Sequence, residues 1–242
     1  MIEIKNVSKS YVKDKKSVDS LNLDIKDGEI FGFLGPNCAG KTTTIRMITG
    51  ILEPDEGDIL IDGHSIKKEP IEAKKNFGFV PDSPDMFLKL KGIEYLNFLA
   101  KVYNVPEQEK NSRIESLTKK FEIFDELNNN IESYSHGMRQ KIVICGVLLS
   151  NPKNWILDEP MTGLDPKASF DLKEMMREHT RNGNTVFFST HILEVAEKLC
   201  DRVGIINKGK VVFVGTFEEM KKKFKEQTSL EELFLEITEQ DV

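Results

Sequence analysis

One segment of eight residues constrains the fold of this chain more than any other. It reads Gly35-Pro36-Asn37-Cys38-Ala39-Gly40-Lys41-Thr42 and fits the pattern G-x-x-x-x-G-K-[ST]. The apolar run Ile30–Leu34 before it is typical of a buried strand, and Thr43–Ile51 after it is typical of a helix. A glycine-rich turn between a strand and a helix points backbone N–H groups at an anion, and the helix N-terminus adds its positive end. This context predicts a nucleoside triphosphate site rather than an ordinary strand-turn-helix.

The side chains of this loop have separate expected roles. Lys41 can reach the β- and γ-phosphates, and the Thr42 hydroxyl can bind Mg²⁺. We expect nucleotide contacts from every residue between Gly35 and Thr43.

Two further strand ends carry polar side chains. The apolar strand Trp155–Leu157 ends in Asp158 and Glu159, and Thr185–Thr190 ends at His191. Ligands of open α/β sheets bind at the carboxyl ends of strands, so we expect Asp158 to hold Mg²⁺ and Glu159 to act as general base. We expect His191 to bind the γ-phosphate or to orient the attacking water. The alternatives are a solvent-facing acidic turn and a histidine satisfied within its loop.

Composition narrows the class of protein. The chain has 242 residues, 39% hydrophobic and 31% charged, with a net charge of −6 and a pI near 5.4. This balance is typical of a water-soluble domain and argues against broad nucleic-acid binding. The basic run Lys221–Lys225 is most simply a solvated helix face. The sequence shows no apolar run near the roughly 20 residues of a membrane span, no signal peptide and no disulfide framework, which predicts a cytosolic protein.

The first part of the chain is rich in short strands. The expected strands are Ile2–Val7, Leu21–Ile25, Ile30–Leu34, Ile59–Ile61 and Phe77–Val80. Asp27-Gly28 is a hairpin signal and Asp62-Gly63 is another turn. These features predict an antiparallel sheet packed beside the nucleotide core.

The rest of the chain divides into three regions. Residues 88–149 show helical spacing and predict an inserted helical subdomain, in which Ser135 caps a helix that runs to about Leu149. Residues 150–215 return to an α/β pattern and complete the core begun by residues 1–87. The expected elements there are the strand Trp155–Leu157, the helix Pro166–Arg181, the strand Thr185–Ser189, the helix Ile192–Leu199 and a hairpin of Val203–Ile206 with Val211–Val214. In the tail, 216–242, Leu230, Leu233, Phe234 and Ile237 predict one apolar helical face that packs on the domain or on a second copy.

The order of these motifs resembles the nucleotide-binding domain of an ABC (ATP-binding cassette) ATPase, from Tyr11 to about Gly215. The decisive segment is Tyr134-Ser135-His136-Gly137-Met138-Arg139-Gln140, which begins a helix 23 residues before Asp158 and resembles the signature motif L-S-G-G-Q. The resemblance implies an α/β P-loop NTPase (RecA-like) core with an antiparallel β-subdomain and an inserted helical subdomain, forming a single domain over 1–242. It also implies ATP and Mg²⁺ as ligands.

The resemblance further implies a pair of copies. In the family the signature motif closes over ATP held by a second copy, so Ser135 and Gly137 would bind the partner's nucleotide. Gly163-Leu164-Asp165 resembles the D-loop that crosses this interface. Tyr11 matches the aromatic residue that stacks on adenine, with a half-buried strand residue as the alternative.

Three positions depart from the family pattern. Cys38 replaces a frequent glycine at a place that favours positive φ, and we expect Mg-ATP to protect it from thiol reagents. His136 replaces the first glycine of the signature motif. Asp82 stands where glutamine is usual, and its carboxylate is expected to ligate Mg²⁺.

By this resemblance the chain is an ATP-hydrolysing subunit that powers a separate membrane permease from the inner face of the membrane. The run Thr162–Pro166, Asp82 and the segment Ser229–Phe234 resemble export-type cassettes. The apolar segment Pro84–Leu88 is the expected contact with the permease, with ordinary packing as the alternative. A soluble ABC ATPase acting on ribosomes or nucleic acid is the alternative function. A GTPase is disfavoured because Asn207-Lys208-Gly209-Lys210 lacks the final aspartate of N-K-x-D.

Overall fold

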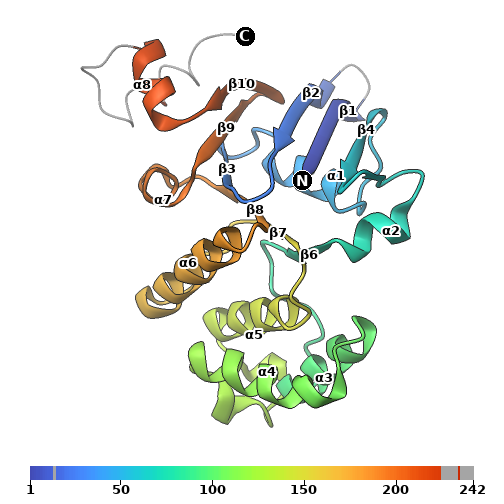
Figure 1. Ribbon diagram of the computed structural model, residues 1–242, viewed down its shortest axis with the longest axis vertical. Coiled ribbons are helices and arrows are strands. Elements are labelled where there is room, and N and C mark those ends of the chain that lie inside the picture. Colours follow the sequence, from blue (N-terminus) through green and yellow to red (C-terminus); the bar gives the residue numbers. More distant parts are fainter. Residues whose placement is uncertain (13–14, 225–233, 235–242) are drawn as a thin grey trace.

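The fold consists of two β-sheets and eight α-helices within the residues that the computed structural model describes, 1–12, 15–224 and 234 (Figure 1). The first sheet has four strands in the order β2-β1-β4-β5, all antiparallel. Its strands are β1 (Ile2–Val12), β2 (Lys15–Ile25), β4 (Glu56–Ile61) and β5 (His64–Ser65). The expected antiparallel subdomain is therefore present, and Asp62-Gly63 joins β4 to β5 as a tight turn.

The second sheet has six strands in the order β10-β9-β3-β8-β7-β6. Its strands are β3 (Ile30–Leu34), β6 (Phe77–Val80), β7 (Asn154–Leu157), β8 (Thr185–Thr190), β9 (Arg202–Asn207) and β10 (Lys210–Gly215). All its neighbours run parallel except the β9–β10 hairpin. Every residue of β3, β7 and β8 is buried, as expected for a parallel sheet covered on both faces.

Alternate residues of the central strands enter different cores. Phe31, Phe33 and Phe187 pack with the four-stranded sheet and with α1 (Lys41–Ile48), and the Phe31 and Phe187 rings stack with centroids 6.0 Å apart. Val186 and Phe188 face the other way, toward the helical part of the chain. Because successive side chains of a strand point to opposite faces, the six-stranded sheet contributes to both cores, one beside the antiparallel sheet and one beside the helices.

The helices lie on both sides of this sheet. Figure 1 shows three of them, α3 to α5, grouped at one end of the molecule, with the antiparallel sheet near the other. The helices besides α1 are α2 (Pro70–Lys75), α3 (Gly92–Val102), α4 (Glu107–Lys120), α5 (His136–Leu148), α6 (Pro166–Arg181), α7 (Leu193–Leu199) and α8 (Phe217–Phe224), with 3₁₀ turns at Phe124–Glu126 and Ile131–Ser133. The expected cap is present, because the Ser135 hydroxyl accepts a hydrogen bond from the Met138 N–H at 3.3 Å.

One predicted hairpin turn and the sheet predicted for one strand were wrong. Asp27-Gly28 does not close a hairpin: it carries the chain from β2 in one sheet to β3 in the other, and the Gly28 N–H donates to the Asn184 carbonyl at 3.0 Å. Phe77–Val80 belongs to the parallel core, where β6 pairs with β7. The dipeptide specifies a local turn and a short apolar run specifies a strand, but neither specifies the pairing partner.

The C-terminal tail prediction lies mostly outside the described residues, which exclude Leu230, Leu233 and Ile237. Phe234 is described, and it packs partly buried against a cluster that includes Phe213, Phe217 and Met220.

Candidate active site

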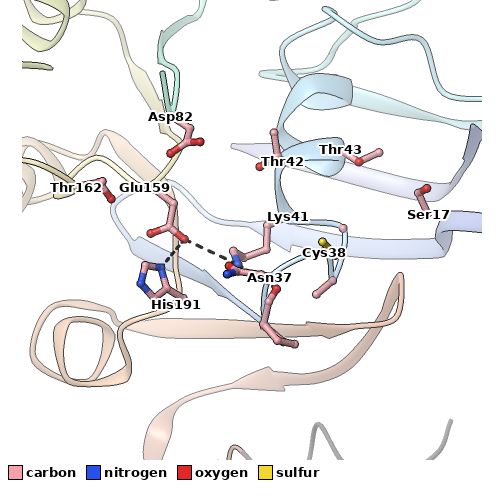
Figure 2. A pocket seen from close by; sticks show the side chains of 13 residues that line it. Ser17, Asn37, Cys38, Lys41, Thr42, Thr43, Asp82, Glu159, Thr162 and His191 are labelled. Carbon is pink, nitrogen blue, oxygen red and sulfur yellow. Dashed lines mark hydrogen bonds and ion pairs between the residues drawn. The ribbon is translucent and has the colours of Figure 1, made fainter. Parts of the chain in front are cut away.

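A cavity of about 480 Å³ lies where the loop after β3 meets the ends of β7 and β8 (Figure 2). Its lining residues are Ser17, Pro36, Asn37, Cys38, Ala39, Gly40, Lys41, Thr42, Thr43, Asp82, Glu159, Thr162 and His191. Figure 2 shows Asp82, Glu159, Thr162 and His191 facing the loop residues Lys41, Thr42 and Cys38 across it. The structure therefore brings three separate sequence motifs to one place.

The phosphate loop owes its shape to its glycines and to one unusual cysteine. Gly40 has a φ of 114°, and a Cβ there would lie 2.7 Å from the Ser17 carbonyl oxygen. A Cβ on Gly35 would lie 2.4 Å from the Ile206 carbonyl oxygen. Cys38 has a φ of 64°, the left-handed backbone expected at this position, and its side chain is exposed. Only glycine adopts such φ values without strain, so this loop stores some strain at Cys38.

Lys41 is buried within the loop that it serves. Its Nζ donates to the Gly35 carbonyl at 2.6 Å and to the Pro36 carbonyl at 3.2 Å. Burial holds the pKa of the ammonium below its usual value, although the Glu159 and Asp158 carboxylates oppose the shift. The ammonium is thus partly desolvated and held by its own loop at the wall of the cavity.

Glu159 lies between two basic groups. One of its carboxylate oxygens, Oε1, is 3.0 Å from His191 Nδ1 and 3.8 Å from Lys41 Nζ. Its backbone is left-handed, with a φ of 46°, and its N–H donates to the Ser189 hydroxyl at 3.0 Å. The strained backbone and this hydrogen bond turn the carboxylate out of the strand end and into the cavity.

Asp158 lies behind the cavity wall, and only 1% of it is exposed. The Ser189 hydroxyl donates to its Oδ1 at 2.6 Å. Burial raises the pKa of Asp158 above its usual value, and the nearby Asp82 charge adds to the rise, while hydrogen bonds from Ser189 and Thr42 oppose it. A cation beside this carboxylate would relieve the cost of burying its charge.

The oxygen donors here suit Mg²⁺, which prefers hydroxyl and carboxylate oxygens and usually takes substrate phosphates as further ligands. Thr42, Asp158 and Asp82 supply such oxygens. Within residues 1–12, 15–224 and 234, no group of three or more His, Cys, Asp or Glu side chains is arranged to hold a metal alone. The residues therefore fit a metal that binds together with a phosphate.

Six of the expected site residues do not line this cavity: Tyr11, Gly35, Ser135, Gly137, Asp158 and Asp165. Ser135 and Gly137 lie at the start of α5, and Asp165 caps α6 by accepting from the Ala168 N–H at 2.9 Å. The His136 ring lies against Gly163 of its own chain rather than at the cavity. Tyr11 is 56% exposed at the rim, with its hydroxyl 3.5 Å from that of Thr43.

Two lining residues were missed from the sequence. Ser17 reaches the cavity from β2, and its carbonyl oxygen lies so close to Gly40 and Gly209 that a Cβ on either glycine would clash with it. No local pattern marks Ser17, because only the pairing of β1 with β2 and the close approach of the β9–β10 turn bring it there. Thr162 stands three residues after Glu159 and could have been inferred from that proximity.

The phosphate loop lies between a buried strand and a helix, and carboxylates follow β7, two strands away in the same sheet; this arrangement defines a P-loop NTPase. Comparisons with known proteins identify the family within this class. The sequence profile of the ABC transporter family matches residues 18–162, and this chain belongs to that family. The linearmycin resistance ATP-binding protein LnrL of Bacillus subtilis is 36% identical over 216 residues, which cover 89% of this chain and 69% of that protein.

Solved structures agree with this family. An ATP-binding subunit of an ABC transporter superposes with a TM-score of 0.92 at 33% identity, over 98% of this chain and 99% of that one. The ATP-binding cassette MJ0796, solved as a dimer in a post-hydrolysis state with ADP and Pi, gives a TM-score of 0.81 at 25% identity, over 89% and 98%. The chain is thus an ATP-binding subunit of the ABC transporter type, with the RecA-like core expected from its sequence. None of the helices in the described part of the chain is long and apolar enough to span a membrane.

Proposed function

We propose that this chain is the Mg²⁺-dependent ATPase subunit of an exporter. Two copies would work together at the inner, cytoplasmic face of a membrane and drive a separate permease. The observation that carries the catalytic part is the placement of Glu159, whose carboxylate is 3.0 Å from His191 and 3.8 Å from Lys41 at the phosphate loop.

The residues divide the work as follows. The backbone N–H groups of Gly35 to Thr43 and the Lys41 ammonium would hold the phosphates. Glu159 would accept a proton from the attacking water, and His191, hydrogen-bonded to Glu159, would orient that carboxylate. Lys41 would stabilise the charge that spreads onto the phosphate oxygens. Thr42, Asp158 and Asp82 would hold Mg²⁺, which when bound neutralises phosphate charge.

A second copy would complete each site. Ser135 is exposed at the capped end of α5 and lies outside the cavity of its own chain. Its helix N-terminus suits a phosphate, so a partner copy's nucleotide is the natural ligand. The dimeric form of MJ0796 supports this arrangement.

The permease would dock on an exposed apolar patch formed by Met86, Phe87 and Phe98. Phe87 is 46% exposed and Phe98 is 47% exposed, and their ring centroids lie 5.8 Å apart. The Phe87 ring also packs against the buried Tyr95 ring, with centroids 5.5 Å apart. Exposed aromatic side chains that support one another are typical of protein interfaces. Export as the direction of transport is supported by the name of LnrL, a resistance protein.

The test joins an ATPase assay to a pull-down. The purified chain should release phosphate from Mg-ATP and stop in EDTA. From gently solubilised native cells it should capture a multi-span membrane protein. Phe87→Ser should lose that capture, whereas Phe170→Ser should keep it, although Phe170 on α6 is the more exposed of the two (62%). Recovery of ribosomal or nucleic-acid factors alone would instead favour the soluble ABC ATPase.

A further inference from the structure

The start of α5 makes a close contact with the loop that follows Glu159 in the same chain. A Cβ on Gly137 would lie 2.5 Å from the Gly163 carbonyl oxygen, and a Cβ on Gly163 would lie 2.4 Å from the His136 ring. Neither distance leaves room for a side chain. The signature end of α5 and the loop 160–165 therefore touch backbone to backbone.

An ion pair fastens the far end of this loop. Lys141 Nζ lies 2.6 Å from Asp165 Oδ2, and the Lys141 side chain is only 11% exposed. The other carboxylate oxygen, Oδ1, accepts the Ala168 N–H that caps α6. The Lys141 ammonium holds the pKa of Asp165 below its usual value, and the cap adds to this effect. Asp165 thus joins α5 and α6 with one oxygen for each.

A buried amide fastens the near end. Gln140 is 1% exposed, and its Nε2 donates to the Pro160 carbonyl at 3.4 Å. Within the described chain its Oε1 has no hydrogen-bond partner, although it is buried. Pro160 directly follows Glu159, whose carbonyl accepts the Thr162 N–H at 3.0 Å. Burying an unpartnered amide oxygen lowers the free energy of unfolding, so the oxygen end of this side chain does not stabilise the fold.

We propose that Gln140 and Lys141 are positioning residues for ATP hydrolysis. Consecutive residues of α5 hold both ends of the loop 160–165, so Ser135 at the start of α5 and the general base Glu159 move as one unit. This inference rests on the proposed pairing of two copies, in which Ser135 serves the partner's site. Engagement of Ser135 at one site would then set the position of Glu159 at the other.

The ion pair can be removed from either side without losing the helix cap. Lys141→Met keeps the aliphatic stem, and Asp165→Asn keeps an oxygen for the Ala168 N–H, because asparagine caps helices as well as aspartate does. Each variant should lower kcat about two- to thirtyfold, the range for a side chain that changes coupling without touching the ligand. The Kd for ATP measured without Mg²⁺ should stay within about twofold. The Hill coefficient for ATP should fall toward one in both variants. Lys141→Arg keeps the positive charge and should therefore keep the kcat of the unmodified chain.

Two comparisons make this reading refutable. The double variant Lys141→Met with Asp165→Asn should be no slower than either single variant, because both remove the same pair. Lys167→Met should leave kcat unchanged: Lys167 pairs with Glu122 and also joins α6 to the helical part, but both side chains are more than half exposed. Any of three results would overturn the proposal. They are a double variant whose loss of kcat is the product of the two single losses, a loss of kcat in Lys167→Met as large as in Lys141→Met, and an unchanged kcat in Lys141→Met.

Amide hydrogen exchange separates this inference from the proposed function. Without nucleotide, the amides of residues 161–165 should exchange faster in Lys141→Met than in the unmodified chain or in Lys167→Met. An unchanged exchange rate would show that Lys141 does not hold the loop 160–165, even if the chain hydrolyses ATP. If exchange is faster in Lys141→Met but the unmodified chain hydrolyses no ATP, the contact of Lys141 with the loop 160–165 would be supported and the proposed function would be refuted. Hydrolysis without cooperativity in the unmodified chain would overturn the link between the two sites.

Discussion

Ser189 offers a sharp test of how the site is built, because one hydroxyl serves two active-site residues. It donates to the Asp158 carboxylate at 2.6 Å and accepts the Glu159 N–H at 3.0 Å, and none of its surface is exposed. Ser189→Ala removes a hydrogen bond to a buried carboxylate and leaves a backbone N–H without its acceptor. Each loss costs about 1–3 kcal/mol, and with partial relaxation we expect the free energy of unfolding to fall by about 2–4 kcal/mol.

The effect should depend on pH in a defined direction. Burial already raises the pKa of Asp158, so ionised Asp158 disfavours the folded state. The unfolded chain therefore binds fewer protons, and this penalty grows as pH rises from the ordinary aspartate value of 3.8 through the folded-state pKa. Ser189→Ala raises the folded pKa further. The destabilisation should therefore increase with pH and be larger at pH 7.5 than at pH 5.

Urea unfolding in EDTA, run at pH 5 and at pH 7.5, measures both the loss in the free energy of unfolding and its dependence on pH. Ser150→Ala is the matched control, because its hydroxyl donates to the Val147 carbonyl at 3.0 Å near the end of α5 and contacts no site residue; we expect it to cost less than about 1 kcal/mol. A loss below about 1 kcal/mol for Ser189→Ala, or one that is equal at both pH values, would refute the reasoning.

Three other predictions concern the same region. Glu159→Gln should slow phosphate release at least about 100-fold while ATP still binds, as filter binding would show; a retained rate would assign the base elsewhere. Maleimide should label Cys38 but not buried Cys145 or largely enclosed Cys200, and Mg-ATP should protect Cys38, as mass spectrometry would report; labelling that ignores ATP would remove Cys38 from the nucleotide contacts. Gly137→Ala should lower kcat and cost about 1–3 kcal/mol in urea, since its Cβ would meet the Gly163 backbone; normal stability would mean that this contact is loose.

The cavity residues that sequence predicted share one property: each lies in a contiguous motif at the end of a buried strand. The phosphate loop needs only its own glycines and the helix that follows, so the lining residues Pro36 to Thr43 could be predicted as a unit. Glu159 and His191 could be predicted because parallel strands end at the same edge. The left-handed backbone at Cys38 followed from the same local logic.

Tertiary contacts decided the remainder. The β6 strand carries the same short apolar pattern as an antiparallel strand, and only pairing with β7 assigns it to the core. Ser17 enters the cavity through the fold of the β1–β2 ribbon, and Gln140 and Lys141 reach the loop 160–165 because α5 packs against it. Sequence by itself determined the local shapes and the class of chemistry, because backbone geometry and strand burial are encoded by neighbouring residues. Which distant segments meet was decided by packing, since the free energy of burial depends on the whole arrangement and not on any one window of sequence.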